Sequence, residues 1–159
     1  MNRIILIPIT DADIPQVMRW MDKPHVKQWF EHPDEWLYEM QHRHDEFAFI
    51  RHFIAMYGLT KIGFCQYYDY FYAQEASYPI TVPQYAYSID YLIGEEAYLR
   101  QGLGKAMIRL LIERIKALGG KEVLSDPMPE NEISQRTLRS VGFRRITDEL
   151  HGMRLEESD

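Results

Sequence analysis

The chain has 159 residues, a formal net charge of −6 and a hydrophobic content of 46%. This length and composition predict a single domain over residues 1–159 with a hydrophobic core of its own. The acidic balance argues against a nucleic-acid partner, because such binding depends on cationic side chains, and no apolar run is long enough to cross a membrane.

The cysteine content indicates the compartment. Cys65 is the only cysteine, so it cannot form an internal disulfide, and its strand-like surroundings favour a buried thiol. The sequence shows neither a secretory nor a lipidation signal. We therefore expect a cytoplasmic protein with no membrane partner, and both a monomer and a homodimer fit the composition.

The first half of the chain predicts strands and short helices from the spacing of its apolar residues. β-branched runs indicate strands, whereas apolar residues three and four positions apart indicate helices. The expected elements are a strand over 3–9, a helix ending at 22, a short helix within 33–45, a hairpin of strands over 47–57 and 62–72, and a loop over 73–83.

The second half gives clearer signals. Its strongest element is an amphipathic helix that begins near Lys105, buries one apolar stripe and stops at Gly119 and Gly120. Asn131 opens a last helix, which closes at Gly142. The remaining expected strands lie over 85–93, 122–125, 143–147 and 150–155.

A glycine-containing turn joins the strand over 85–93 to the long helix. Gly102 and Gly104 lack the Cβ atoms that would keep a ligand from the unpaired amides at the start of the helix. These amides and the positive end of the helix dipole favour an anion such as a pyrophosphate, to which Arg100 and Lys105 would add positive charge. Glycines that serve the backbone turn alone are the alternative.

The spacing excludes two familiar phosphate-binding motifs. A nucleotide-hydrolysing P-loop requires glycine where Leu99 stands and Ser or Thr where Ala106 stands. A dinucleotide-binding fingerprint requires a third glycine where Met107 stands. A pyrophosphate site of another type remains.

The second half contains an ordered set of motifs, which are Ser88-Ile89-Asp90, Arg100 to Lys105, Asp126-Pro127, Pro129, Asn131, Arg136 and Gly142-Phe143. This set resembles the GCN5-related N-acetyltransferase (GNAT) superfamily, and the pattern is most similar to its aminoglycoside 6′-N-acetyltransferases. The amino-terminal half adds His25-Val26 and Trp29, which are similar to the first substrate-side segment of that branch.

The resemblance implies a mixed α/β fold. A central, mostly antiparallel sheet would be flanked by helices and splayed at one strand pair, where acetyl-coenzyme A (acetyl-CoA) binds. The cofactor would contact Arg100, Gln101, Gly102, Leu103, Gly104 and Lys105 through its pyrophosphate, Asn131 through its pantetheine arm, and a main-chain amide near Leu92 through its thioester oxygen.

Asp90 is the expected catalytic residue. A carboxylate inside the apolar run 89–93 is unusual, and it could hold an ammonium group and accept its proton, directly or through water. The resemblance assigns the matching aspartate this role, while a local structural pairing is the alternative. For Asn131, a helix N-cap is the structural alternative.

Aromatic and acidic groups are expected to bind the amine acceptor. Trp29, Asp69 and Glu75 are the candidates beside Asp90, whereas Trp20 and Trp36 fit the core better. The histidines at 42, 44 and 52 do not share one helical turn, so no metal site is expected.

The resemblance therefore implies direct acetyl transfer from acetyl-CoA to a primary amine in a ternary complex. An aminoglycoside 6′-amine is the leading acceptor, and another small amine or a siderophore precursor is the alternative. Many relatives carry a tyrosine that protonates the departing thiolate, but this chain has Leu138 at that place. A noncatalytic acyl-CoA sensor is therefore a third hypothesis.

Overall fold

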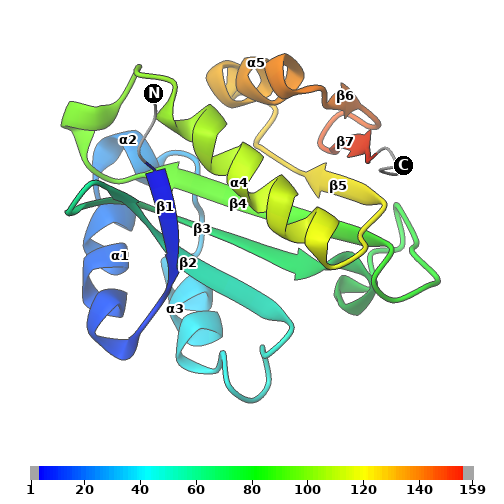
Figure 1. Cartoon of the computed structure of the whole chain (residues 1–159), viewed down its shortest axis with the longest axis horizontal. Coiled ribbons are helices and arrows are strands. Elements are labelled where there is room, and N and C mark those ends of the chain that lie inside the picture. The colour runs from blue at the N-terminus through cyan, green and yellow to red at the C-terminus, as the bar shows by residue number, and fades with distance from the viewer. Residues whose placement is uncertain (1–3, 156–159) are drawn as a thin grey trace.

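A seven-stranded sheet forms the centre of the computed structural model, which describes residues 4–155 (Figure 1). Every neighbouring pair of strands is antiparallel except β4 and β5, which are parallel. In sheet order the strands are β1 (Ile4–Pro8), β2 (Ile50–Tyr57), β3 (Thr60–Asp69), β4 (Ala86–Ile93), β5 (Glu122–Ser125), β7 (His151–Arg154) and β6 (Arg144–Arg145).

Helices cover both faces of this sheet, so the mixed α/β class and the mostly antiparallel sheet are confirmed (Figure 1). One face carries α1 (Ile14–Met21), α2 (Pro24–Lys27) and α3 (Pro33–Gln41). The long helix α4 (Leu103–Ala117) crosses the other face, with α5 (Glu132–Val141) beside it. Short 3₁₀ turns lie at η1 (Asp11–Asp13), η2 (Tyr70–Ala73) and η3 (Glu96–Tyr98).

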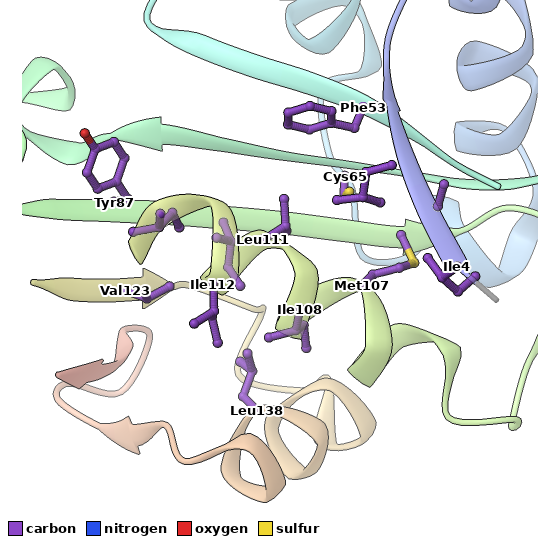
Figure 2. Close-up of a cluster of buried hydrophobic side chains, with 14 of the residues drawn as sticks. Ile4, Phe53, Cys65, Tyr87, Met107, Ile108, Leu111, Ile112, Val123 and Leu138 are labelled. Carbon is purple, nitrogen blue, oxygen red and sulfur yellow. The ribbon is translucent and has the colours of Figure 1, made fainter. Parts of the chain in front are cut away.

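The two larger hydrophobic clusters of the described residues lie on opposite faces of the sheet. The apolar stripe of α4 packs on β1, β3 and β4 and also receives Leu138 from α5, as Figure 2 shows. On the opposite face Trp20 packs with Phe64 and Leu92 and is 1% exposed, which confirms its core assignment. Trp36 packs against the same cluster but is only half-buried, so its core assignment holds in part. Cys65 is fully buried, and burial raises the pKa of its thiol, so it is not a nucleophile.

Some predicted boundaries are wrong. The strand expected over 62–72 ends at Asp69, because the carboxylate of Asp69 accepts a hydrogen bond from the Phe71 amide and starts the turn η2. The strand expected over 47–57 begins only at Ile50, after a series of turns. The last strand pair is shorter than predicted, and residue 3 of the first strand lies outside the described residues.

Candidate active site

A cavity of about 710 Å³ opens where β4 and β5 separate. The two strands pair only through Ala86–Ser88 of β4 and Glu122–Leu124 of β5. Beyond these residues β4 continues to Ile93, whereas Pro127 and Pro129 follow the end of β5 and prevent further strand pairing. The second half of β4 therefore has an open edge that faces the cavity.

The glycine turn forms one end of this cavity. Arg100 and Gly102 adopt left-handed backbone conformations, with φ of 63° and 75°, and α4 begins directly afterwards without a side-chain cap. The first backbone hydrogen bond of the helix runs from the Ala106 amide to the Gly102 carbonyl. The amides of residues 103–105 precede this bond and have no acceptor within the helix.

The turn also leaves space for a ligand. A Cβ atom on Gly102 would meet no heavy atom within 4 Å, and one on Gly104 would lie 3.4 Å from the Tyr91 ring. Arg100, Leu103 and Lys105 line the same end of the cavity. Amides free of internal partners, two cationic side chains and open space fit a pyrophosphate group.

Gln101 does not contribute its side chain to this end. Its amide donates to the Ala97 carbonyl at 2.8 Å, and the residue is exposed outside the cavity lining. The expected contact between Gln101 and the cofactor is therefore limited to its backbone.

Two carboxylates lie at the other end of the cavity. Asp90, on the open half of β4, accepts a hydrogen bond from Gln66 Nε2 at 2.9 Å, and Asp126 follows β5 directly. Burial and the negative charge of Asp126 raise the pKa of Asp90, and burial also raises the pKa of Asp126. No ion pair of the described residues includes either group.

Sequence reasoning named Asp126 only as part of a motif and missed its place beside Asp90. A signal for it existed, because Asp126 follows a strand that runs parallel to β4 and reaches the same side of the sheet. Glu39 on α3 adds a third carboxylate near Asp90. Burial and the neighbouring Glu35 raise the pKa of Glu39 to about 7, and its charge further raises the pKa of Asp90.

The two other acidic candidates for acceptor binding lie elsewhere. The Asp69 carboxylate accepts hydrogen bonds from the amides of Phe71 at 3.1 Å and Gln84 at 2.7 Å, so it fixes both ends of the loop after β3. This internal pairing corrects the expectation that Asp69 binds substrate. Glu75 lies outside the cavity lining as well, although its charge contributes to the raised pKa of Asp126.

Leu92 lines the cavity, but its peptide group points away from the opening. The Gly94 amide donates to Ile62 of β3, and peptide groups alternate along a strand, so Leu92 also faces β3. The carbonyl of Ile93 instead accepts a hydrogen bond from His25 Nε2 at 2.9 Å on the open side. The amides on the open edge are therefore those of Tyr91 and Ile93, which corrects the assignment to Leu92.

Asn131, Tyr91, Ser134 and Trp29 also line the cavity. Asn131 caps α5 through a hydrogen bond from the Ser134 amide to its Oδ1 at 3.1 Å, and it also lines the cavity. The hydroxyl of Tyr91 pairs with Ser134 Oγ at 2.8 Å. Burial raises the pKa of Tyr91, so its phenol stays protonated at neutral pH. Trp29 lines the cavity as expected.

Leu138 is fully buried in the core and offers no group to the cavity. Among residues 4–155, no cluster of three histidine, cysteine or acidic side chains could hold a metal ion. In the same part of the chain no helix is both long and apolar enough to cross a membrane.

The fold and this cleft define a protein of the acetyltransferase class. The family model for the acetyltransferase (GNAT) domain matches residues 10–148. The chain therefore belongs to the GNAT acetyltransferase family.

Relatives in this family include aminoglycoside N(6′)-acetyltransferases. The type 1 enzymes of Klebsiella pneumoniae and Serratia marcescens are each 24% identical to this chain over 153 residues, covering 91% of it and 75% of the relative. A crystal structure of aminoglycoside acetyltransferase AAC(6′)-Ib with coenzyme A superposes with a TM-score of 0.79 at 22% identity, covering 95% of this chain and 94% of the other.

Two further solved structures share the fold. AAC(6′)-Ib with ribostamycin and coenzyme A gives a TM-score of 0.80 at 22% identity, covering 96% of this chain and 94% of the other. The aminoglycoside N(6′)-acetyltransferase from Legionella pneumophila gives 0.75 at 18% identity, covering 97% and 93%.

Proposed function

We propose that the protein transfers the acetyl group of acetyl-CoA to a primary amine of a cationic small molecule, with an aminoglycoside 6′-amine as the first candidate. One observation carries this proposal. A single cavity has unpartnered helix amides at one end and, at the other, two carboxylates that form no ion pair among the described residues. These ends match a pyrophosphate and an ammonium group, respectively.

The cofactor would lie along the open edge of β4. The amides of residues 103–105, with Arg100 and Lys105, would hold the pyrophosphate. The side-chain amide of Asn131 would contact the pantetheine arm while its Oδ1 caps α5. The amides of Tyr91 and Ile93 are the open-edge donors that would stabilise the oxyanion.

The acceptor would bind at the acidic end. Asp90 and Asp126 would attract an ammonium group, and the Trp29 ring adds a surface suited to cations. The raised pKa of Asp90 suits proton acceptance near neutral pH better than an ordinary carboxylate does. An acceptor with several amines would engage both carboxylates at once.

In the reaction, Asp90 in its ionised form would take one proton from the ammonium group. The neutral amine would attack the thioester carbon, the carbon–sulfur bond would break as the amide forms, and the second proton of the attacking nitrogen would pass to solvent water. The Tyr91 phenol, held by Ser134, is the candidate proton donor to the thiolate in place of the tyrosine that Leu138 replaces. Thiols have pKa values near ~8.5, so the leaving group needs little assistance.

The experiment measures coenzyme A release by the purified protein with acetyl-CoA and three acceptors: a kanamycin-type aminoglycoside, a linear polyamine and a hydroxylamine of the siderophore-precursor type. Release with the aminoglycoside supports the full proposal. Release only with another amine keeps acetyl transfer and removes the aminoglycoside. Asp126→Asn should raise the acceptor KM, whereas Asp148→Asn, an exposed position outside the cavity, should not.

The buried Leu138 favours one second candidate, a sensor that binds acetyl-CoA without turnover. A thermal shift with acetyl-CoA tests binding without assuming an acceptor, because a ligand of the native state alone raises its stability. A clear shift combined with no turnover on any amine would favour the sensor over the enzyme.

A further inference from the structure

Three polar side chains cross the sheet in a row next to the active site. His52 on β2 lies opposite Gln66 on β3, and Gln66 lies opposite Asp90 on β4, so all three share one face. His52 is 4% exposed and Gln66 is 2% exposed. The His52 ring stacks on Phe64, with ring centroids 5.8 Å apart. Nothing in the proposed reaction uses His52.

Unpartnered polar atoms are concentrated in this row and at Arg43, whose charge acts on His52. The described residues contain seven buried side-chain nitrogen or oxygen atoms without a hydrogen-bond partner, and four of them belong to Arg43, His52 and Gln66. They are Nε of Arg43, both ring nitrogens of His52 and Oε1 of Gln66. Leaving such groups unsatisfied is destabilising, so a neighbouring group or a buried water is expected to pair them.

The donor and acceptor roles of these atoms are complementary. Arg43 Nε can only donate, and Gln66 Oε1 can only accept. Burial lowers the pKa of His52 to about 4, a side-chain contact with Gln66 opposes this shift, and the positive charge of Arg43 adds to it. A neutral imidazole has one donor and one acceptor nitrogen, which is the pair of roles that Arg43 and Gln66 require.

The Gln66 amide also has a defined orientation. Its Nε2 donates to Asp90 Oδ2, which as a carboxylate oxygen can only accept. This contact turns Oε1 away from Asp90, and the register of the sheet places His52 on the other side of Gln66. Arg43 is itself held, because its other nitrogens donate to the Met40 carbonyl at 2.9 Å and to Asp11 at 2.8 Å.

We propose that His52 is a positioning residue for Asp90. One ring nitrogen accepts a hydrogen bond from Arg43 Nε, and the other donates one to Gln66 Oε1. Each hydrogen bond is either direct or bridged by one buried water. Gln66 is then fixed with its amide N–H on Asp90. The inference rests on the proposed role of Asp90 in proton transfer, and it assigns to His52 a hydrogen-bonding role that packing alone would not need.

Loss of His52 would release Gln66. The Gln66 amide could then rotate and present Oε1 to Asp90, where an acceptor beside a carboxylate disfavours the ionised form. Asp126 and Glu39 already raise the pKa of Asp90, and Gln66 is the hydrogen-bond donor that lowers it. A lost hydrogen bond of ordinary strength should raise this pKa by about half a unit to one unit.

The experiment follows the Asp90 carboxyl carbon by NMR during a pH titration and measures the pH profile of kcat/KM. His52→Leu removes both ring nitrogens, and His52→Asn retains a donor and an acceptor. Ile54→Ala, on the same strand and face, is the control for lost packing. His52→Leu should move the Asp90 titration upward and lower kcat/KM about three- to tenfold at pH values below it.

His52→Asn should recover most of this loss, and Ile54→Ala should lower the melting temperature without moving the titration. An unchanged Asp90 titration in folded His52→Leu would overturn the inference. The NMR arm separates this failure from that of the proposed function. If Asp90→Asn retained full acetyl transfer, the role of Asp90 would be lost, yet the titration would still show whether His52 acts on its carboxylate.

Discussion

Replacing Asp90 by Asn should have opposite effects on activity and on stability. The amide cannot accept the proton of the acceptor ammonium, so turnover should fall by about 10²-fold or more, the usual contribution of a general base. The same change removes a half-buried carboxylate whose pKa is raised by desolvation and by Asp126. We therefore expect the inactive variant to be the more stable protein at neutral pH.

The direction of the stability effect follows from the pKa of Asp90. Burial and Asp126 raise it above 3.8 in the folded protein, so folding favours the protonated form. The contribution of Asp90 to stability is then fully present below the unfolded pKa and is lost as the pH rises through the folded value. At neutral pH the wild-type protein has therefore lost this contribution to its free energy of unfolding, whereas Asp90→Asn, which has no ionisable group at this position, loses nothing as the pH rises.

The magnitude is set by the size of the pKa shift. Each unit corresponds to about 1.4 kcal/mol, and the new amide retains part of the burial penalty and loses a charge-assisted contact with Gln66. A net gain of about 1–2 kcal/mol raises the melting temperature of a chain of this size by roughly 3–6 °C. Thermal unfolding at pH 7.5 and pH 4 should show this gain at the higher pH alone.

Two results of the thermal unfolding experiment would refute this prediction. If Asp90→Asn unfolds at a lower temperature than the wild type at pH 7.5, the contacts of the ionised Asp90, including the one from Gln66, outweigh its desolvation and the repulsion from Asp126. A gain of the same size at pH 4 would show that the effect comes from packing and not from charge. Asp148→Asn, at an exposed position, is the matched control and should leave both temperatures unchanged.

Three other variants test separate parts of the site. Gly104→Val places atoms beside Tyr91 at the glycine turn, so we expect the KM for acetyl-CoA to rise about tenfold or more, a loss of about 1.4 kcal/mol of binding, with little change in the acceptor KM. Tyr91→Phe removes the phenolic proton and should lower kcat about tenfold without altering either KM; an unchanged kcat would exclude Tyr91 as the proton donor. Asp69→Ala leaves two amides without their acceptor, so it should lower stability by about 1–3 kcal/mol in thermal unfolding while the acceptor KM of the folded protein stays the same; a raised KM would return Asp69 to the acceptor site.

Local signals in the sequence were sufficient to predict the helices and strands around the glycine-turn end of the cavity. The strand over 122–125 was predicted with the bounds that β5 has, and the helix after the glycine turn buries Met107, Ile108, Leu111 and Ile115 as predicted. Leu118, predicted in the same stripe, follows the end of the helix and is 49% exposed. Asn131 caps α5 as one of its two predicted roles. Each of these features depends on residues within one or two turns of chain, so the sequence alone contains the information.

The features that the sequence did not predict depend on contacts across the sheet. Asp126 acts on Asp90 only because β4 and β5 run parallel and then separate. The direction of the Leu92 peptide follows from the pairing register of β3 and β4, which composition does not reveal. Asp69 is engaged by the Gln84 amide, 15 positions away, and an acidic residue next to aromatic ones gave no sign of that internal role.

Because β4 and β5 pair over only a few residues, the central sheet of the protein lacks a neighbouring strand beside the second half of β4. The amides of residues 91 and 93 have no strand beside them on that side, so an occupant of the gap must supply the acceptors that a neighbouring strand would. Binding and departure of that occupant would then alternately complete and reopen the hydrogen-bonding edge. Slow amide hydrogen exchange at these two positions in the loaded protein, and fast exchange in the empty one, would report each stage of the catalytic cycle.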